Sequence, residues 1–394
     1  MKRDIIQVFK PSLGQDELEA LRPVFESGWI GLGPKTEEFE QRFAEYVGAK
    51  YAVGVTSATA ALHLACLALG IGPGDEVLVP TITFVSTAHA VAYCGATPVF
   101  VDVDAETLNI DVDDAAAKVT PATKAIIPVH YGGHPCMMDQ LWDLADANGL
   151  AVVEDAAHAC GSAYRGDRIG GLGRTAATCF SFQAVKNLAV GDGGMVTSNR
   201  VEVLTALRRL RWVGIDKSTW DRTEHVTMEL ETETRRFAEY GWYYEVHELG
   251  YKYHMNDIAA AIGLVQLGKL ESANARRREI AQHYGRAFSG LDWLATPVLR
   301  EYALSATHNY AIKTPFRDEL NLHLRDRGIA SGVHYMPIHL QPYYRERKRV
   351  VLPTAESVWT NLLTLPLYPD LSDSQVAYVI ESVSSCPCLG KKPA

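Results

Sequence analysis

Lys186 is the one basic residue in the stretch TCFSFQAVKNLAVGDGG (178–194), and its immediate neighbours carry no charge. A lysine normally stays in water, because moving its ammonium group into apolar surroundings is costly. Desolvation lowers the pKa of an amine and so makes it a better nucleophile. This setting therefore indicates a lysine that reacts, and it raises the question of which partner it reacts with.

A carboxylate precedes this lysine at a matching position. Asp155 follows the segment AVVE (151–154), which is typical of a short strand, and the C-terminal ends of parallel strands face the crevice where α/β proteins bind ligands. An acidic residue at a strand end is common by itself. Together, however, a lysine and a carboxylate match the needs of pyridoxal phosphate (PLP), which forms a Schiff base with the amine and keeps a proton on its ring nitrogen beside the acid.

The segment GVTSATAAL (54–62) contributes a third group to this pattern. Small residues at the first turn of a helix let backbone N–H groups approach a phosphate, and hydroxyl groups add hydrogen-bond donors. Alone, Ser57 and Thr59 fit an ordinary helix cap equally well. The order of a helix start, an aspartate at a strand end and a lysine at a later strand end is far more specific, and it favours a PLP site.

These three groups require a scaffold that brings strand ends together. Short apolar runs typical of strands alternate with segments whose apolar residues have helical spacing. This alternation predicts an α/β fold, a three-layer α/β/α domain whose mostly parallel sheet has helices on both faces. The predicted strands are 51–56, 76–80, 97–103, 124–129, 151–154 and 178–182, and the predicted helices are 15–27, 35–47, 58–69, 86–93, 137–148 and 201–212.

From residue 257 the pattern changes to one long helix at 257–289, of the kind that connects a large domain to a smaller one. A strand at 308–314 and helices at 318–327 and 372–383 follow, and they indicate a small α+β domain. We therefore expect a large domain at 1–256 and a linking helix with a small domain at 257–394. The polar, charge-mixed segment at about 216–236 is expected to be a surface insertion or lid.

Composition narrows the classes of function. The net charge of −9 argues against a nucleic-acid binder, which would normally show a basic face. No stretch approaches the about 20 apolar residues of a membrane span, and the N-terminus has no apolar leader core, so we expect a cytoplasmic protein. The seven cysteines are expected to be reduced and mostly buried, Cys386-Pro-Cys388 is interpreted as tail, and no metal site is expected.

Several motifs then carry a family resemblance. They read TSATAAL (56–62), PTITF (80–84), PVHYG (128–132), EDAAHA (154–159), SFQAVKN (181–187), GDGG (191–194) and GYKYHMND (250–257). In this order they resemble the DegT/DnrJ/EryC1/StrS family of PLP-dependent nucleotide-sugar aminotransferases, within the fold-type I (aspartate aminotransferase) superfamily. The resemblance extends from about residue 9 to about residue 383 and includes SGWIGLGP (27–34) and VHYMPIH (333–339).

The resemblance implies roles for the residues at matching positions. Lys186 is expected to form the Schiff base, Asp155 to contact the pyridinium nitrogen, and His158 to stack on the cofactor ring. The cofactor phosphate is expected to contact Ser57, Ala58, Thr59 and Ser181. Expected substrate contacts are Trp29, Ile30, Thr83, His334 and Tyr335.

In this family the segment that corresponds to 250–257 reaches across a homodimer interface into the neighbouring active site. Relatives often carry asparagine where this chain has Lys252. The resemblance therefore implies a phosphate contact from this segment, which we place at Lys252 and Asn256, with His254 as the alternative.

The implied reaction is a two-stage amino transfer. L-glutamate first gives its amino group to PLP, with the freed Lys186 amine moving the protons. A keto group of a nucleotide-linked sugar, at C4 by resemblance, then accepts the amino group, and the product serves glycan or secondary-metabolite biosynthesis. Candidates for contacting the nucleotide diphosphate are Lys35, Arg211, Lys217, Lys252 and Arg345, although isolated basic residues are more often surface charges.

Other functions remain open on the sequence. Amination at C3, or of a cyclitol or aromatic acceptor, would use the same residues, and the nucleotide could be UDP, dTDP or GDP. Sugar dehydratases of the family carry histidine in place of the lysine, which Lys186 argues against. A non-catalytic regulatory relative would have no need of Lys186, Asp155 and the phosphate loop together.

Overall fold

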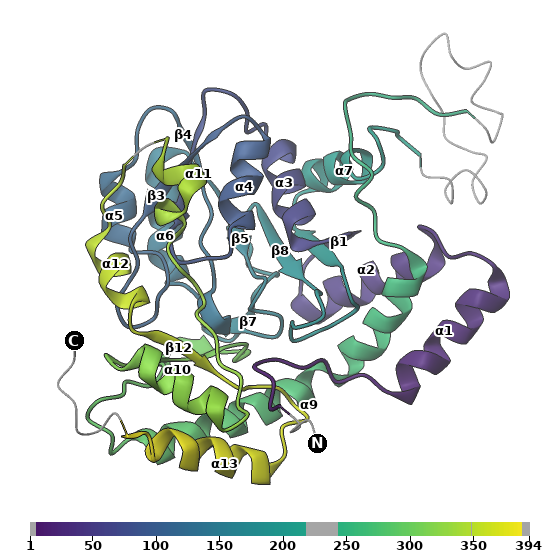
Figure 1. The fold of residues 1–394 in the computed structure, drawn as a ribbon. Coiled ribbons are helices and arrows are strands. Elements are labelled where there is room, and N and C mark those ends of the chain that lie inside the picture. Colours follow the sequence, from purple (N-terminus) through teal and green to yellow (C-terminus); the bar gives the residue numbers. More distant parts are fainter. Residues whose placement is uncertain (1–4, 218–242, 348, 388–394) are drawn as a thin grey trace.

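The computed structural model describes residues 5–217, 243–347 and 349–387 (Figure 1). All but the first two residues of the predicted surface insertion at about 216–236 lie outside this description. No helix of the described ranges is long and apolar enough to cross a membrane.

A seven-stranded sheet with the order β1-β9-β8-β5-β4-β2-β3 forms the centre of the larger part of the molecule. β9 pairs antiparallel with β1 and β8, and the remaining neighbours pair in parallel. The prediction of a mostly parallel α/β sheet is confirmed. The strands are β1 (Tyr51–Val55), β2 (Glu76–Pro80), β3 (Thr97–Val101), β4 (Thr123–Ile126), β5 (Ala151–Asp155), β8 (Ala177–Ser181) and β9 (Gly194–Ser198).

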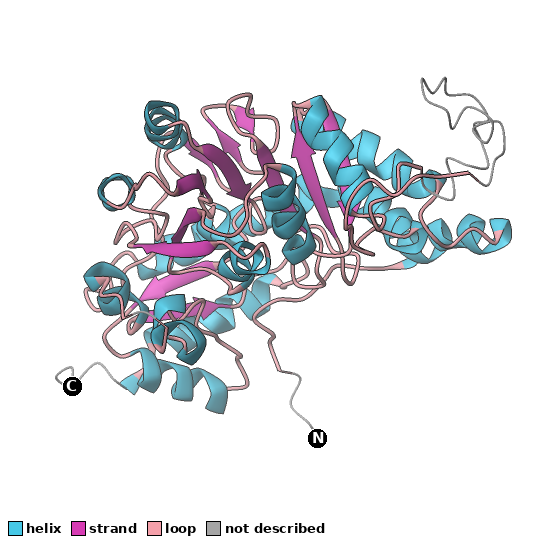
Figure 2. Cartoon of the chain, turned by 90° about the horizontal axis from the view of Figure 1, so that it is seen from above, coloured by secondary structure: helices cyan, strands magenta, loops and turns pink. Residues whose placement is uncertain are grey.

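Helices cover both faces of this sheet, as Figure 2 shows. Buried side chains of α3, α4 and α7 form one core with the sheet, and buried side chains of α2, α5, α6 and the first half of α9 form the other. The helices are α1 (Gln15–Ser27), α2 (Pro34–Val47), α3 (Ala58–Ala68), α4 (Ser86–Tyr93), α5 (Val112–Ala117), α6 (Met138–Asn148), α7 (Val201–Leu210) and α9 (Asp257–Phe288).

Hydrogen bonds from Asn256 and Asp257 cap the start of the long helix α9 and hold it against α2. The Asn256 side chain accepts a hydrogen bond from the backbone of Ala259 and so caps α9. The buried carboxylate of Asp257 accepts bonds from the backbone of Lys35 and from both the backbone and the hydroxyl of Thr36, at 2.8–3.1 Å. The side chains of Asn256 and Asp257 therefore accept hydrogen bonds from N–H groups in the first turns of α9 and α2.

The C-terminal part has its own apolar core, formed by the second half of α9, the β11–β12 pair, α10 and α13, and joined by Ile6 from the N-terminus. The division at residue 256 stays a prediction. Cys386 is buried in this core, so its interpretation as tail is wrong, because α13 carries it back onto the small sheet. The elements of this part are β10 (Ala303–Leu304), β11 (Tyr310–Lys313), α10 (Arg317–Asp326), α11 (Pro342–Arg345), α12 (Pro353–Trp359), β12 (Leu362–Leu365) and α13 (Asp373–Ser384).

The expectation of buried, reduced cysteines holds for six of the seven, which are free and buried in the structure. Two short strands, β6 (Ala163–Tyr164) and β7 (Asp167–Arg168), pair with each other, and β6 also pairs with β10. This small sheet joins the segment after β5 to the segment after α9.

Candidate active site

Two adjacent parallel strands bring the predicted lysine and aspartate to the same edge of the sheet. Asp155 is the last residue of β5 and lies opposite Cys179 of β8. Lys186 follows the end of β8 in a turn, where its N–H donates to the carbonyl of Gln183 at 2.8 Å. Burial lowers the pKa of Lys186 to about 8, and the charge of Asp155 partly opposes that shift. Asp155 thus ends a strand as predicted, Lys186 lies in the turn beyond the next strand, and their roles toward a cofactor stay predictions.

The Asp155 carboxylate is held from two sides. It accepts hydrogen bonds from the Thr87 hydroxyl at 2.8 Å and from the backbone of Ala157 at 3.1 Å. Burial raises its pKa, while these bonds and the charge of Lys186 oppose the rise. Thr83, expected at the substrate, is buried with its hydroxyl 2.9 Å from that of Thr87. Thr87 was not among the predicted site residues, although it lies four residues after Thr83 at the start of a predicted helix, a spacing that places the two hydroxyls near each other.

His158 lies beside the same pair with a defined tautomer. Its Nδ1 accepts from the backbone of Gly132 at 3.3 Å, which leaves the proton of the neutral ring on Nε2, 3.2 Å from the Tyr335 hydroxyl. Burial, with the charges of Lys186 and His334, holds the pKa of His158 well below its usual range. A neutral, flat ring in this position suits packing against an aromatic ligand.

A second histidine lies behind the first. The rings of His308 and His158 stack at 4.4 Å, and the ring of Phe9 stacks on the other side of His308 at 5.1 Å. His308 Nδ1 is 3.0 Å from the side-chain oxygen of Asn187, whose amide nitrogen donates to Asn274 and to the carbonyl of Ala306. These contacts fix the loop immediately after Lys186, and local sequence carried no signal for them.

The predicted phosphate contacts gather at the start of α3. Ser57 caps this helix by accepting from the backbone of Ala60 at 3.1 Å, and the Thr59 hydroxyl is 2.7 Å from that of Ser86. Ser181 pairs with Gly194 in the sheet, and a Cβ added to Gly194 would lie 2.5 Å from the carbonyl carbon of Ser57. The glycine therefore lets β9 pass close to the helix start and brings Ser181 beside Ser57, Ala58 and Thr59.

The segment 250–257 lies along β1 of its own chain, where the backbone of Thr56 donates to the carbonyl of Tyr253 at 2.8 Å. The Lys252 ammonium lies 3.2 Å from the centre of the Trp212 ring, a cation–π contact. Asn256 caps α9. Both side chains thus have partners within the chain, and their predicted contact with cofactor stays a prediction.

The predicted substrate residues lie in three segments, at 29–30, 83 and 334–335. Tyr335 reaches His158, and His334 Nδ1 lies 2.9 Å from the Thr364 hydroxyl. Trp29 donates to the carbonyl of Leu32 within its own loop, and Ile30 is exposed. The structure therefore places Tyr335 beside His158, whereas Trp29 is bonded within its own loop.

Arg211 does not fit its expected position at an entrance. Its side chain is buried, where it pairs with Glu40 and donates to the carbonyl of Gly54 at 2.9 Å. The ion pair is a structural link between α2, the end of α7 and β1. The expectation that Arg211 contacts a diphosphate is therefore wrong, because its guanidinium is already committed.

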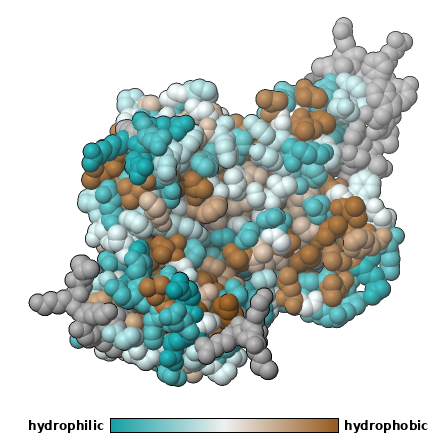
Figure 3. Space-filling model, in the orientation of Figure 1, coloured by the Kyte–Doolittle hydropathy of each residue, from teal (hydrophilic) through white to brown (hydrophobic). Residues whose placement is uncertain are grey.

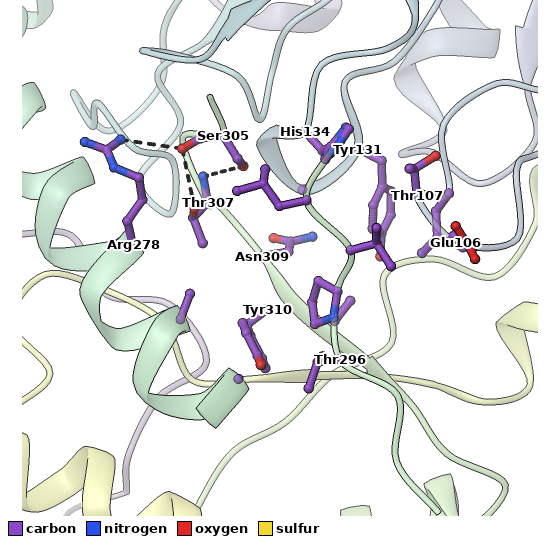
Figure 4. A pocket seen from close by; sticks show the side chains of 18 of the residues that line it. Glu106, Thr107, Tyr131, His134, Arg278, Thr296, Ser305, Thr307, Asn309 and Tyr310 are labelled. Atoms are coloured by element: carbon purple, nitrogen blue, oxygen red, sulfur yellow. Dashed lines mark hydrogen bonds between the residues drawn. The ribbon is translucent and has the colours of Figure 1, made fainter. Parts of the chain in front are cut away.

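A cavity of about 240 Å³ lies behind the turn that carries Tyr131 and Gly132, between α9 and β11 (Figure 4). Figure 4 shows Tyr131, His134 and Asn309 around it. Its lining does not include Lys186, Asp155 or His158. This cavity is therefore separate from the candidate active site at the strand ends.

The groups at the strand ends fit PLP by their chemistry. They comprise an amine whose pKa is about 8, a buried carboxylate, a neutral histidine ring and a cradle of backbone N–H and hydroxyl groups at a helix start. An amine, an acid and a phosphate cradle are the three things that this cofactor requires of a protein.

Comparisons with known proteins agree with this geometry. The model of the DegT/DnrJ/EryC1/StrS aminotransferase family matches residues 11–384. The spore coat polysaccharide biosynthesis protein SpsC of Bacillus subtilis is 43% identical over 383 residues, covering 95% of each chain. The aminotransferase TlmJ of Streptoalloteichus hindustanus has a TM-score of 0.89 at 38% identity, covering 98% of this chain and 100% of its own.

A third relative bears on the cofactor. Spr1654 of Streptococcus pneumoniae, provisionally assigned as a sugar aminotransferase, has a TM-score of 0.87 at 32% identity in its PLP-form. The match covers 97% of this chain and 98% of that one. The same protein is also known in a PMP-form, with the pyridoxamine phosphate that an amino transfer produces.

Proposed function

Because this chain belongs to the DegT/DnrJ/EryC1/StrS aminotransferase family, we propose that it moves the amino group of L-glutamate to the C4 keto group of a nucleotide-linked sugar. The chain is a PLP-dependent sugar aminotransferase of this family. The observation that carries the proposal is that the turn after β8 brings Lys186 close enough to Asp155, the end of the adjacent parallel strand β5, for the aspartate charge to act on the pKa of the lysine.

Each group at the strand ends then has a task toward the cofactor. PLP, when bound, supplies an electron sink that lets the carbon bearing the amino group lose a proton. Asp155, fixed by Thr87, would hold the proton of the ring nitrogen, and the His158 ring would pack on a face of the cofactor. Ser57, Ala58, Thr59 and Ser181 would bind the phosphate.

Lys186 is suited to move protons in both half-reactions. Its pKa of about 8 lies close to neutral pH, so the amine can accept a proton from the donor and return one to the acceptor without a large free-energy cost. Asp155 supports this role, because its charge keeps the lysine pKa from falling further.

The homodimer belongs to the proposal as well. Figure 3 shows apolar side chains gathered on the side of the molecule that carries α1 and the start of α9. Exposed residues there include Leu18, Phe25 and Ile30, which are 63%, 62% and 49% exposed. Contiguous apolar surface of this kind is typical of subunit contacts. A contact there would lie close to the 27–34 loop and the 250–257 segment, which the resemblance places near the active sites.

The test uses the colour of the bound cofactor. We expect purified protein with PLP to show a visible absorbance band that L-glutamate removes and that a nucleotide-linked 4-keto sugar then restores. Lys186→Ala serves as the control, since it cannot form the covalent link. Restoration by a 3-keto sugar alone would overturn the C4 assignment, and a band that glutamate leaves unchanged would overturn the donor.

A further inference from the structure

Arg277 on α9 is a buried cation that forms no ion pair with the described residues. The residue is 3% exposed, and its Nε and Nη1 atoms make no hydrogen bond to any described residue. No carboxylate of the described residues forms an ion pair with it, whereas its neighbour Arg276 pairs with Glu279 and Asp373. A buried charge without an ion pair is costly, so Arg277 is a candidate to meet an incoming anion.

The position of Arg277 links it to the reacting lysine. Arg277 and Lys186 line the same cavity of about 210 Å³, together with Asn187, Gln266, Ser12 and Pro369. The charge of Arg277 also contributes to lowering the pKa of His308, which stacks on His158. One turn earlier on the helix, Asn274 holds Asn187, the residue after Lys186. The helix therefore places two side chains beside the loop that carries Lys186: Asn274, which is hydrogen-bonded to Asn187, and Arg277, which has no ion pair.

The other basic groups of this cavity are already neutralised. Lys269 pairs with Asp16 and Glu17, each at 2.9 Å, and Arg276 has two carboxylate partners. Burial lowers the pKa of Arg277 to about 10, which still leaves the guanidinium charged at neutral pH. The charge of Asp370 raises the pKa of Arg277 without forming an ion pair with it, so an anion that enters the cavity would meet a guanidinium with free hydrogen-bond donors.

We propose that Arg277 binds the α-carboxylate of the amino-acid donor in the cavity that it shares with Lys186. The proposal rests on the proposed aminotransferase function and adds the residue that recognises the donor. A guanidinium offers a planar pair of donors that match a carboxylate, and the pairing is strong where water is excluded. The small cavity suits an amino acid better than a sugar nucleotide.

Measuring the two half-reactions separately tests whether the anion that Arg277 binds belongs to the amino-acid donor or to the sugar nucleotide. In Arg277→Gln, we expect the concentration of L-glutamate that half-saturates removal of the visible band to rise by about 10- to 100-fold, as the loss of a charge-assisted pair implies. The rate at which a keto sugar nucleotide restores the band should stay unchanged. In Arg277→Lys the half-saturating concentration of L-glutamate should lie between the values for the wild type and Arg277→Gln, since lysine keeps the charge but lacks the paired donors of a guanidinium.

A binding measurement removes the dependence on turnover. Glutarate, a dicarboxylate with no amino group, should bind the PLP-loaded wild-type protein by calorimetry and bind Arg277→Gln about 10-fold or more weakly. The matched control is Arg278→Gln, the next residue on the helix, which lines the separate cavity behind Tyr131 and should bind glutarate like the wild type.

Thermal unfolding separates this role from a structural one. Without ligand, Arg277→Gln should unfold at the wild-type temperature or above it, because it removes an unpaired buried charge. A lower unfolding temperature with unchanged glutarate affinity would overturn the proposal, as would equal slowing of both half-reactions. If the wild type reacts with another amino acid and not with glutamate, the donor assignment fails, and the Arg277 test is run with that amino acid.

Discussion

Lys186 and Asp155 affect each other's pKa, and single substitutions can measure this effect. Burial lowers the pKa of Lys186 to about 8, and the charge of Asp155 acts in the opposite direction. The neutral amine is the nucleophile that captures PLP. We therefore expect the rate at which cofactor-free protein recombines with PLP to rise with pH through about 8 and to level off above it. In Asp155→Asn the midpoint should move to lower pH, because the charge that favours the ammonium form is gone.

Stopped-flow absorbance of the protein with excess PLP provides the measurement, and free PLP with a model amine corrects for the titration of the cofactor itself. Thr87→Val is a useful companion, because it removes the hydrogen bond to Asp155 and keeps the charge. A midpoint that moves upward in Asp155→Asn would contradict the electrostatic account.

At the scale of elements, the phosphate cradle depends on how closely β9 passes the start of α3. A methyl group on Gly194 would lie 2.5 Å from the Ser57 carbonyl carbon, so Gly194→Ala must push the strand and the helix start apart. We expect this variant to lose about 1–3 kcal/mol of stability, as overpacked sites do. It should also bind PLP about 10-fold or more weakly, because the helix N-terminus no longer meets the phosphate. Urea unfolding and a PLP titration provide the two measurements.

Gly173→Ala is the matched control, since a Cβ at Gly173 meets no atom within 4 Å. It should leave both the free energy of unfolding and the PLP affinity near their wild-type values. Equal effects in the two variants would show that the close approach at Gly194 is not what shapes the cradle.

At the scale of the whole molecule, the proposed homodimer makes a prediction about surface residues. Leu249, which is 88% exposed, directly precedes the segment 250–257 that the family resemblance places across the dimer interface. A charge in an apolar contact is costly to bury. We expect Leu249→Asp to weaken dimerisation by about 10-fold or more in sedimentation velocity, as changes at interface centres do.

Activity should then fall at low protein concentration and recover at high concentration. Leu322→Asp, a similar change at a 49% exposed leucine on α10, is the control and should leave the association state unchanged. A monomeric wild-type protein that is fully active would contradict the shared active sites.

The alternation of strands and helices and the order of the strand-end residues could be predicted from the sequence, because apolar periodicity and small-residue turns are local properties. The sequence predicted α1, α4 and β2 with their observed bounds. It did not predict β9, which begins within a glycine run and is buried along its whole length, so it shows no alternation of exposed and buried residues.

Which distant side chains meet at the site could be seen only in the tertiary structure. Thr87 reaches Asp155 across 68 positions, and His308 reaches Asn187 across 121. The same holds for two buried arginines: Arg211, a predicted diphosphate contact, is paired with Glu40, whereas Arg277, for which the sequence made no prediction, forms no ion pair with the described residues. Burial and long-range pairing set the charge state and the freedom of a side chain, and both depend on the packing of elements that lie far apart in the chain.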